Sequence, residues 1–285
     1  MTTKGRRLQI THHTGYRYSD VVDASFNDVR MTPLSEAGQV LVQHQLQVTP
    51  SSSVMAYLDY WGAWVESFDV HVPHRVLEIT ATSLVETPAM QADTPGTSWD
   101  EVRSSSVQDA YAEFLDVSEY VDDARLDRAR ASLLDTVEQA DTPRAAVLAV
   151  VSAVRDRITY TPGVTTVYTT AAQAWAAGHG VCQDFSHATL SMLRALGIPA
   201  RYVSGYLHTE EPALGETVIG ESHAWVEYWD GHWLAIDPTN NRGVGPGHVI
   251  VARGRDYSDV PPLKGIYAGG ASEGLGVKVE ITQIG

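Results

Sequence analysis

The sequence predicts an α+β protein, in which an N-terminal antiparallel β-sandwich-like domain precedes a core with a helix packed on an antiparallel sheet. Three observations support this prediction. Residues 8–87 carry the period-two alternation of apolar and polar side chains that is typical of half-buried strands. Residues 87–98 are rich in turn-forming residues and lack apolar periodicity, as a connection between domains does. Helical periodicity and a second set of strands follow. We therefore expect domains at residues 1–95 and 96–285.

Within the first domain, the alternation is plainest over residues 39–48 and 75–85. Two histidines, His12 and His13, are neighbours on the expected first strand. Neighbouring residues of a strand point to opposite faces, so we expect ordinary polar contacts for both and no shared metal ion.

Helices dominate the chain after the connection. Their candidate segments are residues 108–116, 123–135 and 143–157. The third opens with Thr142 as N-cap and Pro143 at the first helical position. The sequence Thr-Ala-Ala-Gln at 170–173 has the spacing of a capping box and predicts a short helix that runs to Gly178.

A longer helix is expected after a loop broken by glycines. Its buried face is indicated by residues at spacings of three and four, namely Phe185, Thr189, Met192, Leu193 and Leu196. Gly197 and Pro199 supply its end. The helix therefore opens near Cys182, the only cysteine among the 285 residues.

A thiol in the opening turn of a helix is a candidate nucleophile. The first turn offers unpaired backbone N–H groups and a partial positive charge, which lower the pKa of a cysteine from its usual value of about 8.5. The same N–H groups can hold a developing oxyanion. The alternative for Cys182 is a buried thiol that packs as a small hydrophobe.

Residues 200–207, 223–229 and 232–236 alternate as strands, and a last strand at 277–284 closes a sheet or returns to the first domain. The segments 210–220 and 240–276 are candidates for loops that line a substrate cleft.

The hairpin around Asp230-Gly231 decides which side chains meet. Side-chain patterning favours a three-residue loop, residues 229–231, over a two-residue loop, because it gathers the apolar side chains on one face. In that register Tyr228 lies opposite His232, and His223 lies directly opposite Asp237. A carboxylate in this position fixes the tautomer of the imidazole and stabilises its protonated form.

Cysteine, histidine and aspartate together form an arrangement for covalent acyl transfer, in which a thiolate attacks a carbonyl and leaves a thioester for a second nucleophile. We assign these roles to Cys182, His223 and Asp237. Taken singly, His223 also fits a strand histidine bonded to the backbone, and Asp237 a turn-forming residue before Pro238. The occurrence of all three in this order favours the catalytic interpretation.

Other polar residues near Cys182 fit other roles. His187 lies five residues along the helix, about 500° around its axis and off the Cys182 face. His179 has no obvious orienting carboxylate, so neither histidine is our candidate base. Asp184 is a first-turn acid that the helix dipole favours, although a negative charge near the thiol opposes its ionisation.

An oxyanion site needs two donors, and the backbone N–H of Cys182 supplies one by geometry. The second comes from the indole N–H of Trp175 or from the hydroxyl of Tyr160. Trp175 fits a core position as well.

Four motifs resemble the bacterial transglutaminase-like family. They are GVCQDF at 180–185, the run LRALGIPARYVSGYL at 193–207, HAWVE at 223–227 and IDPT at 236–239. The resemblance implies a papain-like core, with a cysteine on a helix facing a histidine on a sheet, and implies the triad roles of Cys182, His223 and Asp237. The N-terminal third resembles the β-rich domain that often precedes this core in bacterial members. The family includes amide-crosslinking enzymes, proteases, amidases and proteins without catalysis, so the resemblance does not fix the reaction.

Composition agrees with a soluble enzyme, since 285 residues that are 44% hydrophobic and 19% charged are enough for one large domain or two smaller ones. Twenty basic and thirty-five acidic residues give a formal net charge of −15, which argues against nucleic-acid and anionic-membrane partners. A single cysteine excludes an internal disulfide and a zinc site built on paired thiols. We expect no metal and no cofactor. The N-terminus lacks the apolar stretch of a signal peptide, so we expect a cytoplasmic protein.

The sequence thus predicts a thiol-dependent acyl enzyme that cleaves or transfers amide bonds of a peptide or another amide-containing substrate. The alternative is a non-catalytic binding module on the same scaffold, which presents its cleft to a partner. The sequence leaves the oligomeric state open.

Overall fold

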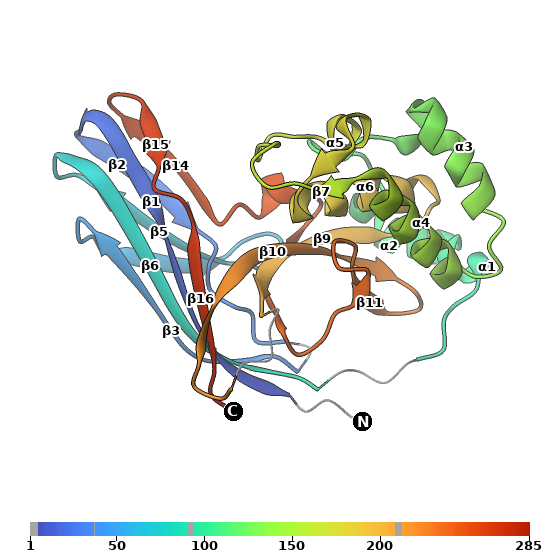
Figure 1. The fold of residues 1–285 in the computed structure, drawn as a ribbon, viewed down its shortest axis with the longest axis horizontal. Coiled ribbons are helices and arrows are strands. Elements are labelled where there is room, and N and C mark those ends of the chain that lie inside the picture. Colours follow the sequence, from blue (N-terminus) through green and yellow to red (C-terminus); the bar gives the residue numbers. More distant parts are fainter. Residues whose placement is uncertain (1–4, 37, 90–93, 209–212) are drawn as a thin grey trace.

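The computed structural model describes residues 5–36, 38–89, 94–208 and 213–285. It shows an α+β protein, as the sequence predicted. Antiparallel sheets occupy one half of the molecule, and helices cover the sheet of the other half (Figure 1).

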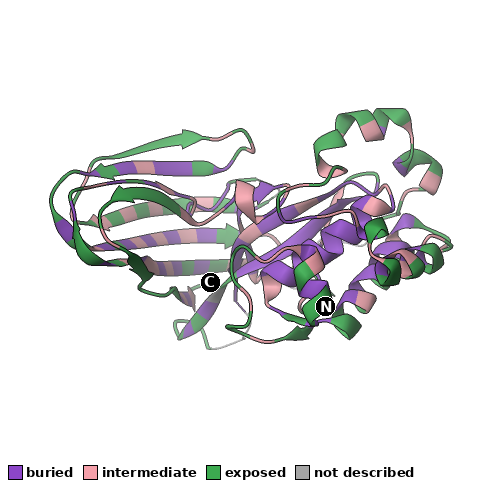
Figure 2. Ribbon diagram, turned by 90° about the horizontal axis from the view of Figure 1, so that it is seen from above, coloured by how far each residue is buried: buried purple, intermediate pink, exposed green. Residues whose placement is uncertain are grey.

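Six strands build the N-terminal half. They are β1 (Arg6–Val22), β2 (Ala24–Val29), β3 (Val40–Thr49), β4 (Val54–Leu58), β5 (Trp64–Val70) and β6 (His74–Thr87). Strands β1, β6 and β3 pair in one sheet, and β2, β5 and β4 in another. Residues such as Leu77 and Ile79 of β6 and Phe68 of β5 are buried in one common core, as in a sandwich. Several of these strands, β6 among them, alternate buried residues with less buried ones (Figure 2), whereas β4 is exposed throughout.

The last strands of the chain return to this half. They are β14 (Leu263–Ala268), β15 (Ser272–Gly274) and β16 (Lys278–Gln283). β14 pairs with β2, β15 pairs with β1, and β16 lies between β1 and β10 (Thr217–Trp229). The last strand therefore both closes a sheet and returns to the first strands, and a continuous sheet of order β12-β11-β10-β16-β1-β6-β3 joins the two halves (Figure 1). The division at residue 95 stays a prediction.

The remaining strands form the sheet of the C-terminal half, apart from one short parallel pair. They are β7 (Thr159–Tyr160), β8 (His179–Gly180), β9 (Ala200–Leu207), β11 (Trp233–Asp237), β12 (Arg242–Gly243) and β13 (His248–Gly254). β9 lies between β10 and β13, while β7 and β8 pair only with each other. The sequence missed β12, β13, β14 and β15, because they fall within residues 240–276, which were interpreted as loops. Strand β10 likewise begins at Thr217, inside the segment 210–220 that was interpreted as a loop.

The helices follow the predictions in part. Six α-helices are described: α1 (Trp99–Val102), α2 (Ser105–Ala110), α3 (Arg128–Val137), α4 (Pro143–Arg157), α5 (Ala171–Ala177) and α6 (Cys182–Ala195). Helix α4 has the predicted Thr142 cap, whose hydroxyl accepts the Ala145 N–H at 3.2 Å. Helix α5 has its capping box and ends at Gly178 in the left-handed conformation.

Two predicted helices are shorter than expected. The segment 108–116 divides into α2 and the 3-10 turn η1 (Ala112–Phe114). The break is at Tyr111, because its ring packs against that of Trp233, with 5.2 Å between the ring centres. The segment 123–135 divides into η2 (Ala124–Leu126) and α3. There the Asp127 carboxylate accepts the Arg130 N–H at 2.9 Å and starts a new helix.

Helix α6 forms the centre of the C-terminal half. Most of its residues are buried, and it packs on β10 and β9 and against α4 and α5. Ala224, Val226 and Ile236 of the hairpin lie in the same core, as the apolar face predicted. Among the described residues, no helix is long and apolar enough to cross a bilayer.

Candidate active site

Cys182 is the first residue of α6, where the sequence predicted it. The turn is held by Asp184, whose carboxylate accepts the Val181 N–H and the Thr165 hydroxyl, both at 2.7 Å. A Cβ atom at Gly180 would lie 2.5 Å from Asp184 Cβ, so only glycine lets the chain approach this closely. Burial raises the pKa of Asp184, and these two hydrogen bonds counter it.

The thiol opens into a cavity of about 360 Å³. The C-terminal half contributes Cys182, Tyr202, His223 and Tyr257 to its walls, while the N-terminal strands and the last hairpin contribute residues such as Gly15, Tyr16 and Val277. The cavity therefore lies where the two halves meet. None of the described residues that line it is an aspartate, glutamate, lysine or arginine.

The hairpin that carries His223 has a pairing register shifted by two residues from the predicted one. Trp229 pairs with Trp233, so the loop is residues 230–232 and not 229–231. Tyr228 lies opposite Leu234 and not His232, and in this register the position opposite Asp237 belongs to Trp225.

The cause of the shift is a tertiary contact at the loop. The buried Asp230 carboxylate binds Arg144 Nε of α4 at 2.7 Å and accepts the Thr97 N–H at 2.8 Å, while Gly231 at the tip adopts a φ of 80°. These contacts hold Asp230 as the first residue of the loop, so that the loop is formed by residues 230–232. Because strand side chains alternate with period two, a shift of two residues leaves His223 and Asp237 on one face, as diagonal neighbours.

His223 and Asp237 are joined by a hydrogen bond of 2.9 Å between Nε2 and Oδ2. Asp237 is fully buried and accepts three further hydrogen bonds in its own turn: from Asn240 Nδ2 at 2.7 Å and from the N–H groups of Thr239 and Asn240 at 3.1 Å each. Burial alone would raise the pKa of Asp237, but the bonds from His223, His248 and Asn240 hold it well below its usual range.

The second ring nitrogen of His223 is the one left for the thiol. Nδ1 is buried and makes no hydrogen bond of normal geometry to a described residue. Burial lowers the pKa of His223, yet hydrogen bonding to Asp237 and Cys182, together with their charges, outweighs it and raises the pKa to about 10. The imidazole is thus poised between a buried carboxylate and a thiol.

His248 is a polar residue of this site that sequence reasoning missed. Its Nε2 lies 3.2 Å from Asp237 Oδ2, and its Nδ1 accepts the Gly245 N–H at 3.2 Å. Since Nδ1 is an acceptor, the proton must lie on Nε2, which donates to Asp237. Burial lowers the pKa of His248, although Asp237 counters it. The apolar run after His248 could have revealed the strand, but nothing local indicates its partner.

Other residues considered from the sequence lie away from the cavity. His187 is buried between the rings of Tyr120 and Tyr202, its Nε2 accepts the Tyr257 N–H at 3.2 Å, and burial lowers its pKa to about 4. His179 is exposed and bonds the Thr161 hydroxyl at 3.3 Å.

Neither sequence candidate for the second oxyanion donor lines the cavity. Trp175 is buried in the core, and Tyr160 is 44% exposed at the surface. The first-strand histidines make separate contacts, as expected from their opposite orientations: His12 Nδ1 lies 3.0 Å from the Tyr206 hydroxyl, and His13 Nδ1 lies 3.0 Å from the Thr80 hydroxyl.

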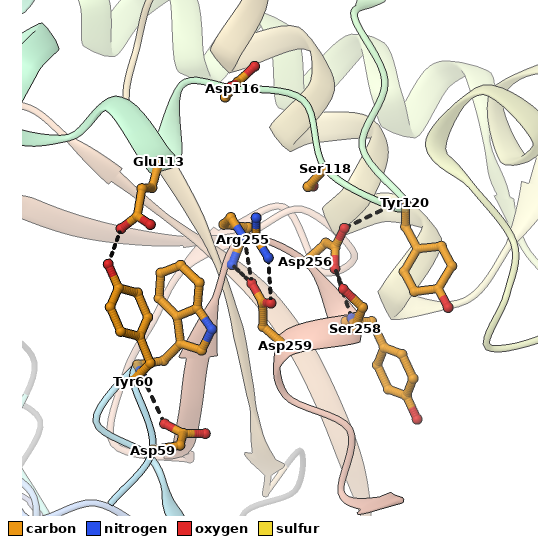
Figure 3. A network of polar contacts seen from close by, with 12 residues as sticks. Asp59, Tyr60, Glu113, Asp116, Ser118, Tyr120, Arg255, Asp256, Ser258 and Asp259 are labelled. Atoms are coloured by element: carbon orange, nitrogen blue, oxygen red, sulfur yellow. Dashed lines mark hydrogen bonds and ion pairs between the residues drawn. The ribbon is translucent and has the colours of Figure 1, made fainter.

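A polar network holds the turn that carries Tyr257 (Figure 3). The turn is η3 (Tyr257–Asp259), where Arg255 binds Asp259 at 2.9 Å and the Asp256 carboxylate accepts the Tyr120 N–H at 2.8 Å. Arg255 also lies over the Trp61 ring, 5.3 Å from its centre. The network thus ties η3 to the turn between β4 and β5, and so fixes a wall of the cavity from both halves.

Comparison with known proteins agrees with this architecture. Residues 131–238 match the model of the transglutaminase-like superfamily, and residues 8–86 match that of the bacterial transglutaminase-like N-terminal region. The chain belongs to the transglutaminase-like superfamily. The first match contains Cys182, His223 and Asp237, and the second contains nearly all of β1–β6.

Two mycobacterial relatives of this transglutaminase-like protein extend over nearly its whole length. The uncharacterized protein ML0607 of Mycobacterium leprae is 40% identical over 98% of this chain and 99% of its own. The uncharacterized protein Rv2569c of Mycobacterium tuberculosis is 35% identical over 96% of this chain and 92% of its own. A protein-glutamine gamma-glutamyltransferase of Pseudomonas aeruginosa is 43% identical over 65 residues, only 10% of its length.

The fold is shared with a solved structure. A "Putative Cysteine Protease" from Cytophaga hutchinsonii superposes with a TM-score of 0.79 over 100% of this chain and 93% of that one, at 20% sequence identity.

Proposed function

We propose that the protein is a thiol-dependent acyl enzyme that acts on amide bonds through Cys182, His223 and Asp237. One observation carries the proposal: a cysteine at a helix N-terminus shares a cavity with a histidine whose far nitrogen is bound by a buried aspartate. The membership of the superfamily supports it. The cytoplasmic location and the identity of the partner stay predictions.

The first half-reaction forms a thioester. The sulfur of Cys182 attacks the carbonyl carbon, and the negative charge passes to the carbonyl oxygen. His223, protonated at Nδ1, then gives its proton to the leaving nitrogen as the C–N bond breaks. Asp237 holds Nε2–H and stabilises the imidazolium before this transfer.

The second half-reaction restores the enzyme. Water or an amine gives a proton to His223 Nδ1 as its oxygen or nitrogen attacks the thioester carbon. The bond from that carbon to sulfur breaks, and the thiolate–imidazolium pair forms again. When water is the nucleophile the product is a carboxylic acid, and when an amine is the nucleophile the product is a new amide.

The walls of the cavity favour an uncharged group at the reacting position. Tyrosine, valine and glycine are the most frequent residues in these walls. Burial lowers the pKa of His12 to about 4, so that this side chain is neutral near pH 7. A carboxamide or a peptide bond fits these surroundings without the desolvation cost of a charge. This supports a peptide or another amide-containing substrate.

Acylation of the wild type by 4-nitrophenyl acetate tests the proposal. We expect release of one equivalent of nitrophenol in a burst, and intact mass spectrometry should show one acetyl group, which peptide mapping places on Cys182. Cys182→Ala should show neither. A wild type that is not acylated, or a variant that is acylated equally, would refute the proposed enzymatic function and favour the alternative, a non-catalytic binding module on this scaffold.

A further inference from the structure

The proposed chemistry needs more stabilisation than one backbone donor supplies. A tetrahedral intermediate places a negative charge on the former carbonyl oxygen, and sites of this kind hold that oxygen with two donors. The N–H of Cys182, in the first turn of α6, has no acceptor within the helix and is one. The second must come from a residue that lines the cavity.

Tyr202 occupies a rigid position beside this helix. It lies on β9, where it pairs with Val226 of β10 on one side and Gly254 of β13 on the other. Its ring centre lies 5.1 Å from that of His187 in α6. The side chain is 2% exposed, yet it lines the same cavity as Cys182 and His223.

The hydroxyl of Tyr202 makes no hydrogen bond to any residue that the structure describes. The hydroxyl of a buried tyrosine side chain usually has a partner. This hydroxyl is not among the fully enclosed polar atoms, so it is open to the cavity that Cys182 and His223 line. Tyr206 lies four residues along the same strand, and its hydroxyl has two partners: His12 Nδ1 at 3.0 Å and the Met31 carbonyl oxygen at 3.4 Å. The contrast marks the Tyr202 hydroxyl as a donor that faces a ligand.

The charge state of Tyr202 suits a donor. Burial raises the pKa of its hydroxyl well above the usual value, and the negative charge of Cys182 raises it further. The phenol therefore keeps its proton at every pH at which the enzyme would work, and it lies near enough to Cys182 to feel its charge.

We propose that the Tyr202 hydroxyl, together with the backbone N–H of Cys182, binds the oxyanion formed when the Cys182 thioester is made and broken. This assignment rests on the proposed function. It makes Tyr202 a catalytic residue that donates a hydrogen bond but transfers no proton.

Tyr202→Phe tests the assignment, because it removes the hydroxyl and keeps the ring that packs against His187. Two reactions of Cys182 are compared. Acylation by 4-nitrophenyl acetate passes through an oxyanion, whereas alkylation by iodoacetamide displaces iodide at a saturated carbon and forms none. We expect acylation to slow by about 10²–10³-fold, the usual effect of losing one such donor, and alkylation to keep its rate. Tyr57→Phe is the matched control, since it removes the hydroxyl of an exposed tyrosine on β4, outside the cavity, and should change neither rate.

Two results would overturn the assignment. Acylation of Tyr202→Phe at the wild-type rate would show that the hydroxyl does not bind the oxyanion. An equal loss of acylation and alkylation would show that Tyr202 positions the thiol instead, and an unchanged melting temperature would exclude misfolding as the cause. A failure of the proposed function is distinct, because the wild type itself would then show no acylation.

Discussion

Two buried carboxylates on the same sheet differ in what they can do. Asp237 of β11 binds His223 at 2.9 Å and His248 at 3.2 Å. Glu227, four residues along β10 from His223, binds Arg201 Nε and Arg253 Nε at 2.7 Å each. Arg253 also pairs with Glu36 of the N-terminal half.

The comparison shows that the basic side chain bound to a buried carboxylate decides whether that carboxylate can serve catalysis or only stability. A guanidinium keeps its proton at any working pH, so the Glu227 cluster can only hold strands together. An imidazole exchanges its proton in the neutral range and can serve a reaction, provided that a nucleophile is near. His223 has Cys182 within its reach, while neither arginine of the Glu227 cluster lines the cavity.

The largest effect is expected for Asp237→Asn. The amide keeps the shape but loses the negative charge, so it neither stabilises the imidazolium nor enforces the tautomer with a proton on Nε2. Acylation by 4-nitrophenyl acetate should fall by about 10⁴-fold, as for the equivalent change in serine enzymes. Stopped-flow measurement of the nitrophenol burst checks this. A variant within tenfold of the wild type would remove Asp237 from the proposed mechanism.

Glu227→Gln should show the opposite pattern. It leaves the buried Arg253 and the half-buried Arg201 with less compensation, and breaking a buried ion pair costs about 3 kcal/mol of unfolding free energy. Urea unfolding followed by tryptophan fluorescence measures this loss. Below the unfolding transition, acylation should proceed at the wild-type rate. A strong loss of acylation in a fully folded variant would show that Glu227, like Asp237, contributes to catalysis, and would contradict its purely structural role.

His248→Gln should have a smaller effect, on acylation. His248 donates one hydrogen bond to Asp237, and a hydrogen bond to a charged group contributes about 1.5 kcal/mol, which corresponds to roughly tenfold in rate. His248→Phe, which offers no donor, should lose at least as much, whereas glutamine can restore part of the bond. Equal rates for the wild type and both variants would show that His248 only fills space.

Much of this site could be predicted because its determinants are local. The opening turn of α6, the capping box of α5 and the Thr142 cap depend on residues within a few positions, and all three are present. Period two is local as well. It placed His223 and Asp237 on one face even though the predicted register was wrong by two residues.

The rest depends on contacts between distant segments. The loop of the hairpin is set by Arg144 and Thr97, more than 80 residues away from Asp230. His248 reaches Asp237 through a strand within a region rich in glycine and proline, which predicts loops. Tyr202 follows the ordinary alternation of β9, and only the assembled cavity distinguishes its hydroxyl from that of Tyr206.

The pH dependence of Cys182 alkylation tests the central claim most directly. A pKa of about 10 for His223 means that the imidazolium persists through neutral pH and is lost only as the pH rises through that value. We therefore expect iodoacetamide to modify the wild type rapidly at about pH 6, because the imidazolium stabilises the thiolate, and His223→Ala to react only as the pH nears the ordinary thiol value of about 8.5. Wild-type alkylation that follows the curve of an ordinary thiol, unchanged in His223→Ala, would contradict the account.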